Sequence, residues 1–127
     1  MSANDENFRR LTPAEQAILG KLLELSFPGR DELASQLVDL NAKPTDAQGS
    51  LRLQVTKGRV AHLNKGVAVE ARYPDLGKEG EVGAHVNVLL HVANGKLSML
   101  EIFKDDGSAI LKAPDPAEFQ LFSKHEK

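Results

Sequence analysis

The chain contains no cysteine, which excludes disulfide bonds, thiolate nucleophiles and cysteine-ligated zinc. It has no tryptophan and a single tyrosine, so few rings are present on which nucleic-acid bases could stack. The 18 acidic and 16 basic side chains nearly cancel, so no global charge draws the chain to nucleic acid or to an anionic membrane. No apolar run approaches the ~20 residues of a membrane helix, and the polar start lacks the apolar segment of a secretory signal. We therefore expect a cytoplasmic protein that binds neither nucleic acid nor membrane.

The length and composition fit one globular domain. The chain has 127 residues, of which 41% are hydrophobic, enough to bury a core of its own. We expect a mobile polar N-terminus over residues 1–10, a single α+β domain over residues 11–122 and a polar tail over residues 123–127.

The N-terminal third has the pattern of two helices. Thr12 can cap a helix, Pro13 suits its first position, and Glu15 can reach back to the cap amide. This predicts an amphipathic helix over residues 13–25, which Phe27-Pro28-Gly29 ends. A second helix is expected to begin near Arg30, and the two together read as a helical hairpin.

The rest of the chain has the pattern of strands and turns. Apolar and polar residues alternate from Leu51 to Val55, which is typical of a half-buried strand. Strands are also predicted over residues 84–93 and 96–104, because they flank Asn94-Gly95, a strong hairpin signal. Residues 74–83 are expected to be a loop. The predicted fold class is α+β, with the helical hairpin packed on one face of a largely antiparallel sheet of about four to six strands.

Two of the four histidines lie in the first strand of this hairpin. His85 and His91 are on one face of a regular strand, but about 20 Å apart at ~3.3 Å per residue. Two ligands of one zinc must both lie ~2 Å from the metal, so this pair cannot share one. The sequence therefore predicts no metal site, and it contains no motif that predicts a cofactor.

Glu101 is a single carboxylate within an apolar pattern. With a two-residue turn at Asn94-Gly95, Leu90 is expected to face Met99, and Glu101 then joins the apolar face that meets the helices. A carboxylate buried there needs a cationic partner or must keep its proton. Three interpretations of Glu101 follow. It is a structural carboxylate paired with an arginine, a residue at a strand end that reaches solvent, or a general acid or base with His91 or Glu70 nearby.

The second face of the predicted hairpin mixes polar and apolar side chains. An apolar area with a polar rim is typical of a surface that binds a protein partner or forms a homodimer. Coverage by the C-terminal phenylalanines is an equal alternative. The candidate binding residues on this face are His85, Asn87, Leu89, His91, Ser98, Leu100 and Ile102.

Several segments resemble a family of small bacterial proteins of unknown function. They are Phe8-Arg9-Arg10-Leu11-Thr12-Pro13, Phe27-Pro28-Gly29-Arg30, Val88-Leu89-Leu90-His91 with Asn94-Gly95, and the segment Leu100 to Gly107. The resemblance spans most of residues 8–117 and implies no catalytic residue. In size and α+β layout the chain also resembles the immunity proteins encoded beside bacterial toxins.

Two functional hypotheses follow. The first is a small, non-enzymatic, protein-binding domain, with an immunity protein that neutralises a bacterial toxin as its specific form. The second is a small enzyme or ligand-binding domain that uses Glu101 with His91 or Glu70.

Overall fold

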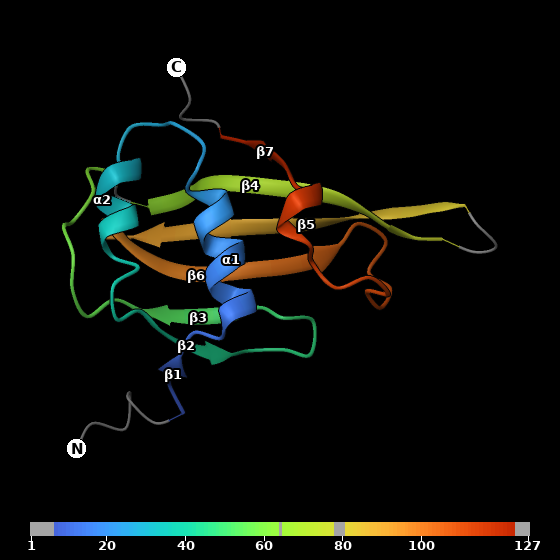
Figure 1. Ribbon diagram of the computed structural model, residues 1–127, viewed down its shortest axis with the longest axis horizontal. Helices are drawn as coiled ribbons and strands as arrows, with labels where there is room; N and C mark the ends of the chain where they lie inside the picture. Colours follow the sequence, from blue (N-terminus) through green and yellow to red (C-terminus); the bar gives the residue numbers. More distant parts are fainter. Residues whose placement is uncertain (1–6, 64, 78–80, 124–127) are drawn as a thin grey trace.

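The structure, a computed structural model, describes residues 7–63, 65–77 and 81–123. Within them, seven strands form one sheet in which every neighbouring pair runs antiparallel. The strand order is β1-β2-β3-β6-β5-β4-β7 (Figure 1). The predicted α+β class and antiparallel sheet are confirmed, with more strands than expected.

The strands are β1 (Arg9–Arg10), β2 (Asn41–Pro44), β3 (Leu51–Gln54), β4 (Lys65–Leu76), β5 (Val82–Ala93), β6 (Lys96–Lys104) and β7 (Gln120–Phe122). Arg9 and Arg10, which belong to the expected polar lead, therefore pair with β2. The predicted loop over residues 74–83 is wrong at both ends, because β4 continues to Leu76 and β5 begins at Val82, and residues 78–80 lie outside the described residues. Residues 1–6 and 124–127 lie outside the described residues, so the expected mobile start and polar tail stay predictions.

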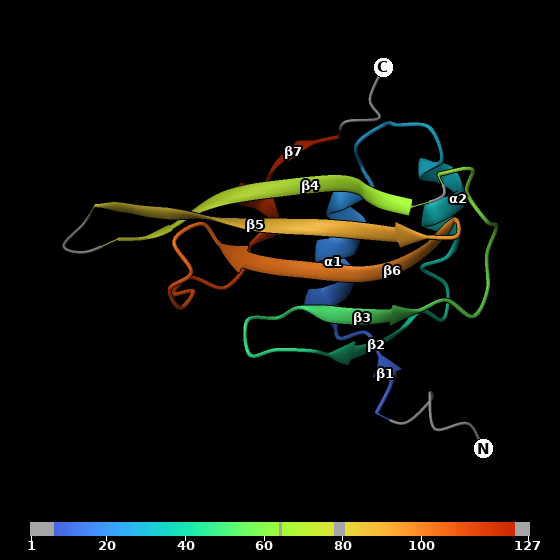
Figure 2. The ribbon, with the colours of Figure 1, turned by 180° about the vertical axis from the view of Figure 1, so that it is seen from behind.

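Two short helices, α1 (Pro13–Leu22) and α2 (Arg30–Ser35), precede the main strands, and a 3-10 turn, η3 (Pro116–Glu118), follows them. α1 lies across the middle of one sheet face, and α2 lies near the end of the sheet where β5 turns into β6 (Figure 1). Figure 2 shows the opposite face of the sheet with no described helix over it. Packing of the two helices on each other as a hairpin stays a prediction.

α1 begins as the sequence predicts. The Glu15 amide donates to the Thr12 hydroxyl over 3.1 Å, and the Thr12 amide donates to the Glu15 carboxylate over 2.9 Å, which completes a capping box. Arg9 donates to both oxygens of the same carboxylate, at 2.8 and 2.9 Å. This bidentate pair fastens β1 to the start of the helix.

The turn of the central hairpin is Asn94-Gly95, as predicted. Both residues have positive φ, of 55° and 75°, as a two-residue hairpin turn requires. Gln36, fully buried just after α2, holds this turn: its Nε2 donates to the carbonyls of Arg59 and Gly95 over 2.6 and 2.9 Å. Its Oε1 accepts from the Leu97 amide over 2.8 Å. One side chain thus joins α2, the segment after β3 and the hairpin.

The expected hairpin register is correct for the pair next to the turn and wrong beyond it. Val92 pairs with Leu97, but Leu90 pairs with Leu100 where Met99 was expected. The cause is a register shift between β5 and β6, in which β6 contains one residue more than β5.

The extra residue is Ser98. Because successive side chains of a strand point to opposite faces, one extra residue moves every later side chain to the other face. Met99 and Glu101 consequently point away from α1, and Leu100 and Ile102 point toward it, with exposed fractions of 0% and 2%. The prediction that Glu101 lies on the apolar, helix-facing side is wrong.

The core lies between the sheet and the helices. From the sheet it takes alternate residues of β5, from Val86 to Val92, and from α1 it takes Leu19 and Leu22. The C-terminal segment joins the core on this side, where the ring of Phe119 stacks on Tyr73 at 5.8 Å between centroids. The described part of this segment therefore leaves the centre of the opposite face uncovered (Figure 2).

Candidate functional site

We call the sheet face opposite α1 the open face (Figure 2). Strand pairing and the alternation of burial assign side chains to it, since residues directly opposite each other in a pair share a face. The assigned residues are Arg10, Asn41, Lys43, Arg52, Gln54, Val67, Glu70, Arg72, Pro74, His85, Asn87, Leu89, His91, Met99, Glu101, Phe103, Gln120 and Phe122.

The middle of the open face is apolar. Leu89 and Met99 lie on the two central strands, with Phe103 farther along β6 and Val67 on β4. Phe103 and, at the β7 edge, Phe122 are 37% and 36% exposed. These side chains receive no cover from a described helix, so apolar area remains in contact with solvent.

His91 and Glu101 meet on the same two strands, directly beside Leu89 and Met99. The Nε2 atom of His91 lies 2.9 Å from Oε1 of Glu101, and the two side chains are 27% and 41% exposed. They come from β5 and β6, and the Ser98 bulge is what turns Glu101 to the side of the histidine. Glu70 is two strands away with Leu89 between, because Leu89 pairs with both Glu70 and Glu101. Of the three candidate catalytic residues, the structure brings two together.

The predicted binding residues divide into three groups. His85, Asn87, Leu89 and His91 lie on the open face, half-buried between neighbouring strands. The predicted exposure of Leu100 and Ile102 is wrong, since both are core residues beneath α1, and Ser98 is the half-buried bulge residue. The physical reason is again the extra residue in β6, for which the local sequence contains no bulge signal such as a glycine.

The open face carries charge of both signs in different places. Lys43 and Arg52 are directly opposite each other on β2 and β3. Glu70 lies on β4, on the far side of the two central strands. Beside it on the same strand, Arg72 donates to Asp105 over 3.0 Å, and Asn87 donates to the other oxygen of Asp105 over 2.6 Å.

A buried ion pair that the sequence did not predict lies on the helix side, at the far end of the sheet. Nζ of Lys104 is 2.9 Å from Oδ2 of Asp75, and the two side chains are 6% and 0% exposed. Asp75 also accepts backbone amide hydrogen bonds from Leu76, Leu111 and Lys112, of 2.8, 2.9 and 2.7 Å. The pair therefore ties the end of β4 to the end of β6 and to the segment that follows β6.

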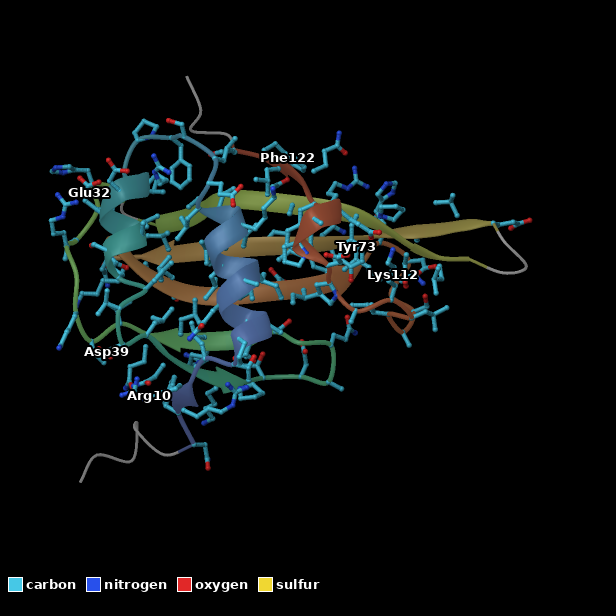
Figure 3. The ribbon with its side chains drawn as sticks, viewed as in Figure 1. Arg10, Glu32, Asp39, Tyr73, Lys112 and Phe122 are labelled. Carbon is cyan, nitrogen blue, oxygen red and sulfur yellow. The ribbon has the colours of Figure 1, made fainter. Side chains whose placement is uncertain are left out.

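These contacts shift the pKa values of Asp75 and of the neighbouring Tyr73. Burial alone would raise the pKa of Asp75, but the hydrogen bonds from the Leu111 amide and the Lys104 ammonium outweigh it and hold that pKa well below its usual range. Burial, together with the negative charges of Asp75 and Glu118, raises the pKa of Tyr73 to about 12. The Tyr73 hydroxyl donates to the Lys112 carbonyl over 2.8 Å, and Figure 3 shows the two residues side by side. Asp75, Lys104 and the Tyr73 hydroxyl each have partners within the fold, which favours a structural role over a catalytic one.

Three surface pockets are lined by described residues. The first, of about 470 Å³, lies between the β4–β5 hairpin and the loop after β6, and Leu76, Lys104 and Leu111 contribute to its wall. The second, of about 390 Å³, lies on the other side of Leu76, and the third, of about 300 Å³, is formed by Pro28, Gly29, His62 and Leu63. His91 and Glu101 line none of these three.

Within the described ranges, no group of three or more histidine, aspartate or glutamate side chains is placed to hold a metal ion. No described helix is both long enough and apolar enough to cross a membrane.

Comparison with known proteins gives a family and no function. The model of a family described as "Domain of unknown function (DUF6984)" matches residues 8–114, nearly the whole range in which the sequence resembles a family of unknown function. Comparisons with curated proteins and with solved structures give no significant match. Since the matched range spans most of the chain and contains α1, α2 and the strands β1 to β6, the chain belongs to this family of unknown function.

Proposed function

We propose that the chain is a non-enzymatic, cytoplasmic protein-binding domain whose binding surface is the open face. The observation that carries the proposal is the uncovered apolar centre of that face, formed by Leu89, Met99 and Phe103 and surrounded by charged and polar side chains. An apolar centre with a polar rim is the anatomy of protein interfaces. A folded sheet that is covered on one face only also has a second face available for a partner.

The test compares partner capture by three forms of the immobilised chain. Leu89→Lys places a charge at the centre of the open face, and Val38→Lys is the control, because Val38 is 58% exposed and lies outside the sheet. A stoichiometric partner from the native host should be retained by the wild type and by Val38→Lys, and lost by Leu89→Lys. Circular dichroism must show that both variants are folded.

Two outcomes would contradict the proposal. A partner that all three forms retain equally binds elsewhere, and the absence of any stoichiometric partner removes the basis for a binding function. The compact α+β layout, similar to that of immunity proteins, makes a toxin encoded beside this chain the first purified partner to test.

The second candidate function is a small enzyme that uses His91 and Glu101. The specific observation is their 2.9 Å contact, which matches the geometry by which a carboxylate orients an imidazole for proton transfer. If the purified chain has a proton-transfer or hydrolytic activity, Glu101→Gln and His91→Asn should each reduce it at least about a hundredfold. An activity that survives both substitutions would exclude this pair as its source.

A further inference from the structure

We propose that the protein partner of the open face is a second copy of the chain, and that two copies associate face to face as a symmetric dimer. The inference rests on the proposed function and names the partner for the same surface. The distribution of charges over the open face and the size of that face support it.

One half of the face is basic. Lys43 and Arg52 are cross-strand neighbours, and neither makes an ion pair with any described residue. Like charges directly opposite each other destabilise a strand pair. A negative group above β2 and β3 would relieve this repulsion.

The other half supplies such a group. Glu70 on β4 is half-buried on the open face and, among the described residues, has no cationic partner. The neighbouring Arg72 is already paired with Asp105, and Glu101 is paired with His91. Among the described residues, Glu70 is thus the carboxylate on this side that makes no hydrogen bond or ion pair through its side chain, and its sign is opposite to that of Lys43 and Arg52.

Symmetry brings the two halves together. In an isologous dimer the same patch is used by both copies, so a face must be complementary to itself. β6 is the middle strand of the order, with β3 and β2 on one side and β5 and β4 on the other. A two-fold axis that runs along β6 between the two sheets places β2 of one copy over β4 of its partner. Lys43 of each copy then lies over the strand that carries Glu70 in the other, and Arg52 lies beside it over β5. Met99 and Phe103 of the two copies meet at the axis, with Glu101, held by His91 of its own copy, between them.

The size of the face is sufficient for such a contact. Six residues of each of the three central strands, β4, β5 and β6, cover about 15 Å by 20 Å, and the shorter β1, β2, β3 and β7 add about two thirds of that area again. The contact area is then roughly 500 Å² per copy, or roughly 1,000 Å² in total, near the smallest area of a specific interface. Packed sheets of this kind lie about 10 Å apart, a distance that the side chains of Leu89 and Met99 can fill.

The experiment measures the dissociation constant of the full-length chain by sedimentation velocity over a wide concentration range. The wild type should form a dimer that weakens as salt is added, because the charged rim is screened. Lys43→Glu and Glu70→Arg should each weaken the dimer at least about tenfold, since β2 of one copy lies over β4 of the other and each substitution places like charges against each other across the interface. The double variant, Lys43→Glu with Glu70→Arg, restores opposite charges and should recover most of the wild-type affinity.

Glu24→Arg is the matched control for Glu70→Arg, since it changes the net charge equally at an exposed residue beyond the end of α1. It should leave the dissociation constant unchanged. A chain that is monomeric at every concentration would overturn the proposal. A dimer whose dissociation constant neither single substitution on the open face changes would overturn it too. Either result would leave the broader binding function open, because that function is tested separately by partner capture with Leu89→Lys.

Discussion

At the scale of single residues, Asp75 and Lys104 show how a buried charge is accommodated. The carboxylate receives three backbone amide hydrogen bonds and one ammonium contact, so its desolvation is compensated by several donors. The ammonium has fewer contacts, the second being a 3.5 Å hydrogen bond to the Ala109 carbonyl. Loss of the lysine therefore leaves a negative charge without its counter-ion, while the amides continue to hold it.

We expect Lys104→Met to lower the free energy of unfolding by about 3–5 kcal/mol, the usual cost of removing one partner from a buried ion pair. Urea denaturation of the purified variant measures the change. The control is Lys112→Met, which removes a pair with Glu118 whose side chains are 34% and 36% exposed. That variant should lose at most about 1 kcal/mol, and equal losses in both variants would contradict a structural role for the buried pair.

The pH dependence of stability follows from the same carboxylate. Because the pKa of Asp75 is lower in the folded chain than in the unfolded one, its ionised form stabilises the fold above the unfolded pKa of about 3.9. This contribution is lost as the pH falls from there toward the folded pKa. Asp75→Asn, which cannot ionise, should reduce the slope of unfolding free energy against pH below pH ~4. An unchanged slope in denaturant titrations at several acidic pH values would argue against this assignment.

At the scale of elements, the central hairpin turn has a backbone requirement and a packing requirement. Gly95 and Gly107 both have φ of 75°, a conformation that costs side-chain-bearing residues free energy. A Cβ at Gly95 would lie 2.4 Å from the Ala61 carbonyl oxygen, whereas one at Gly107 would meet nothing within 4 Å. A substitution at Gly107 thus tests the backbone conformation alone, whereas one at Gly95 tests the backbone conformation together with a steric clash.

Gly107→Ala should cost about 1 kcal/mol of stability, the price of the left-handed conformation alone. Gly95→Ala should cost at least about 3 kcal/mol, because it also pushes the segment at Ala61 away from the turn and disturbs the hydrogen bonds of Gln36. Thermal unfolding of the two variants side by side measures the difference. Similar melting temperatures would show that the contact at Ala61 relaxes freely.

Local sequence patterns predicted the elements that depend on local interactions. The capping box of Thr12 and Glu15 and the Asn94-Gly95 turn each depend on a few adjacent residues, and both formed as expected. The Ser98 bulge could not be predicted, since it depends on how β6 matches β3 and β5 at once. The buried Ser50 hydroxyl illustrates this, because it accepts from the Ile102 amide over 2.9 Å and so fixes β6 from outside the hairpin.

The difference between local and long-range interactions also explains which residues of the candidate site were predicted correctly. Alternation correctly placed His85, Asn87, Leu89 and His91 together, because β5 is regular along that stretch. The Ser98 bulge places Glu101 on the same face as these four residues, and it turns Leu100 and Ile102 toward the core. Asp75 was missed because Pro74-Asp75 has the composition of a turn, and no local pattern joins it to a lysine at the end of a distant strand.

At the scale of the whole molecule, the sheet should differ in stability from centre to edge. β5 pairs with β6 on one side and β4 on the other along most of its length, whereas β1 and β7 pair on one side only and contain two and three residues. Amide hydrogen exchange should therefore be slowest in β5 and β6 and fastest in β1 and β7, by several orders of magnitude. Uniform protection across all seven strands would contradict this order.

The two outer strands have a further consequence for how the protein can be handled. A long unpaired strand is a template on which other chains can add and aggregate. Here β1 and β7 cover part of the outer sides of β2 and β4, and both are too short to act as such a template themselves. A deletion that removes either one would uncover a longer strand. Such shortened forms should aggregate under conditions in which they are still folded.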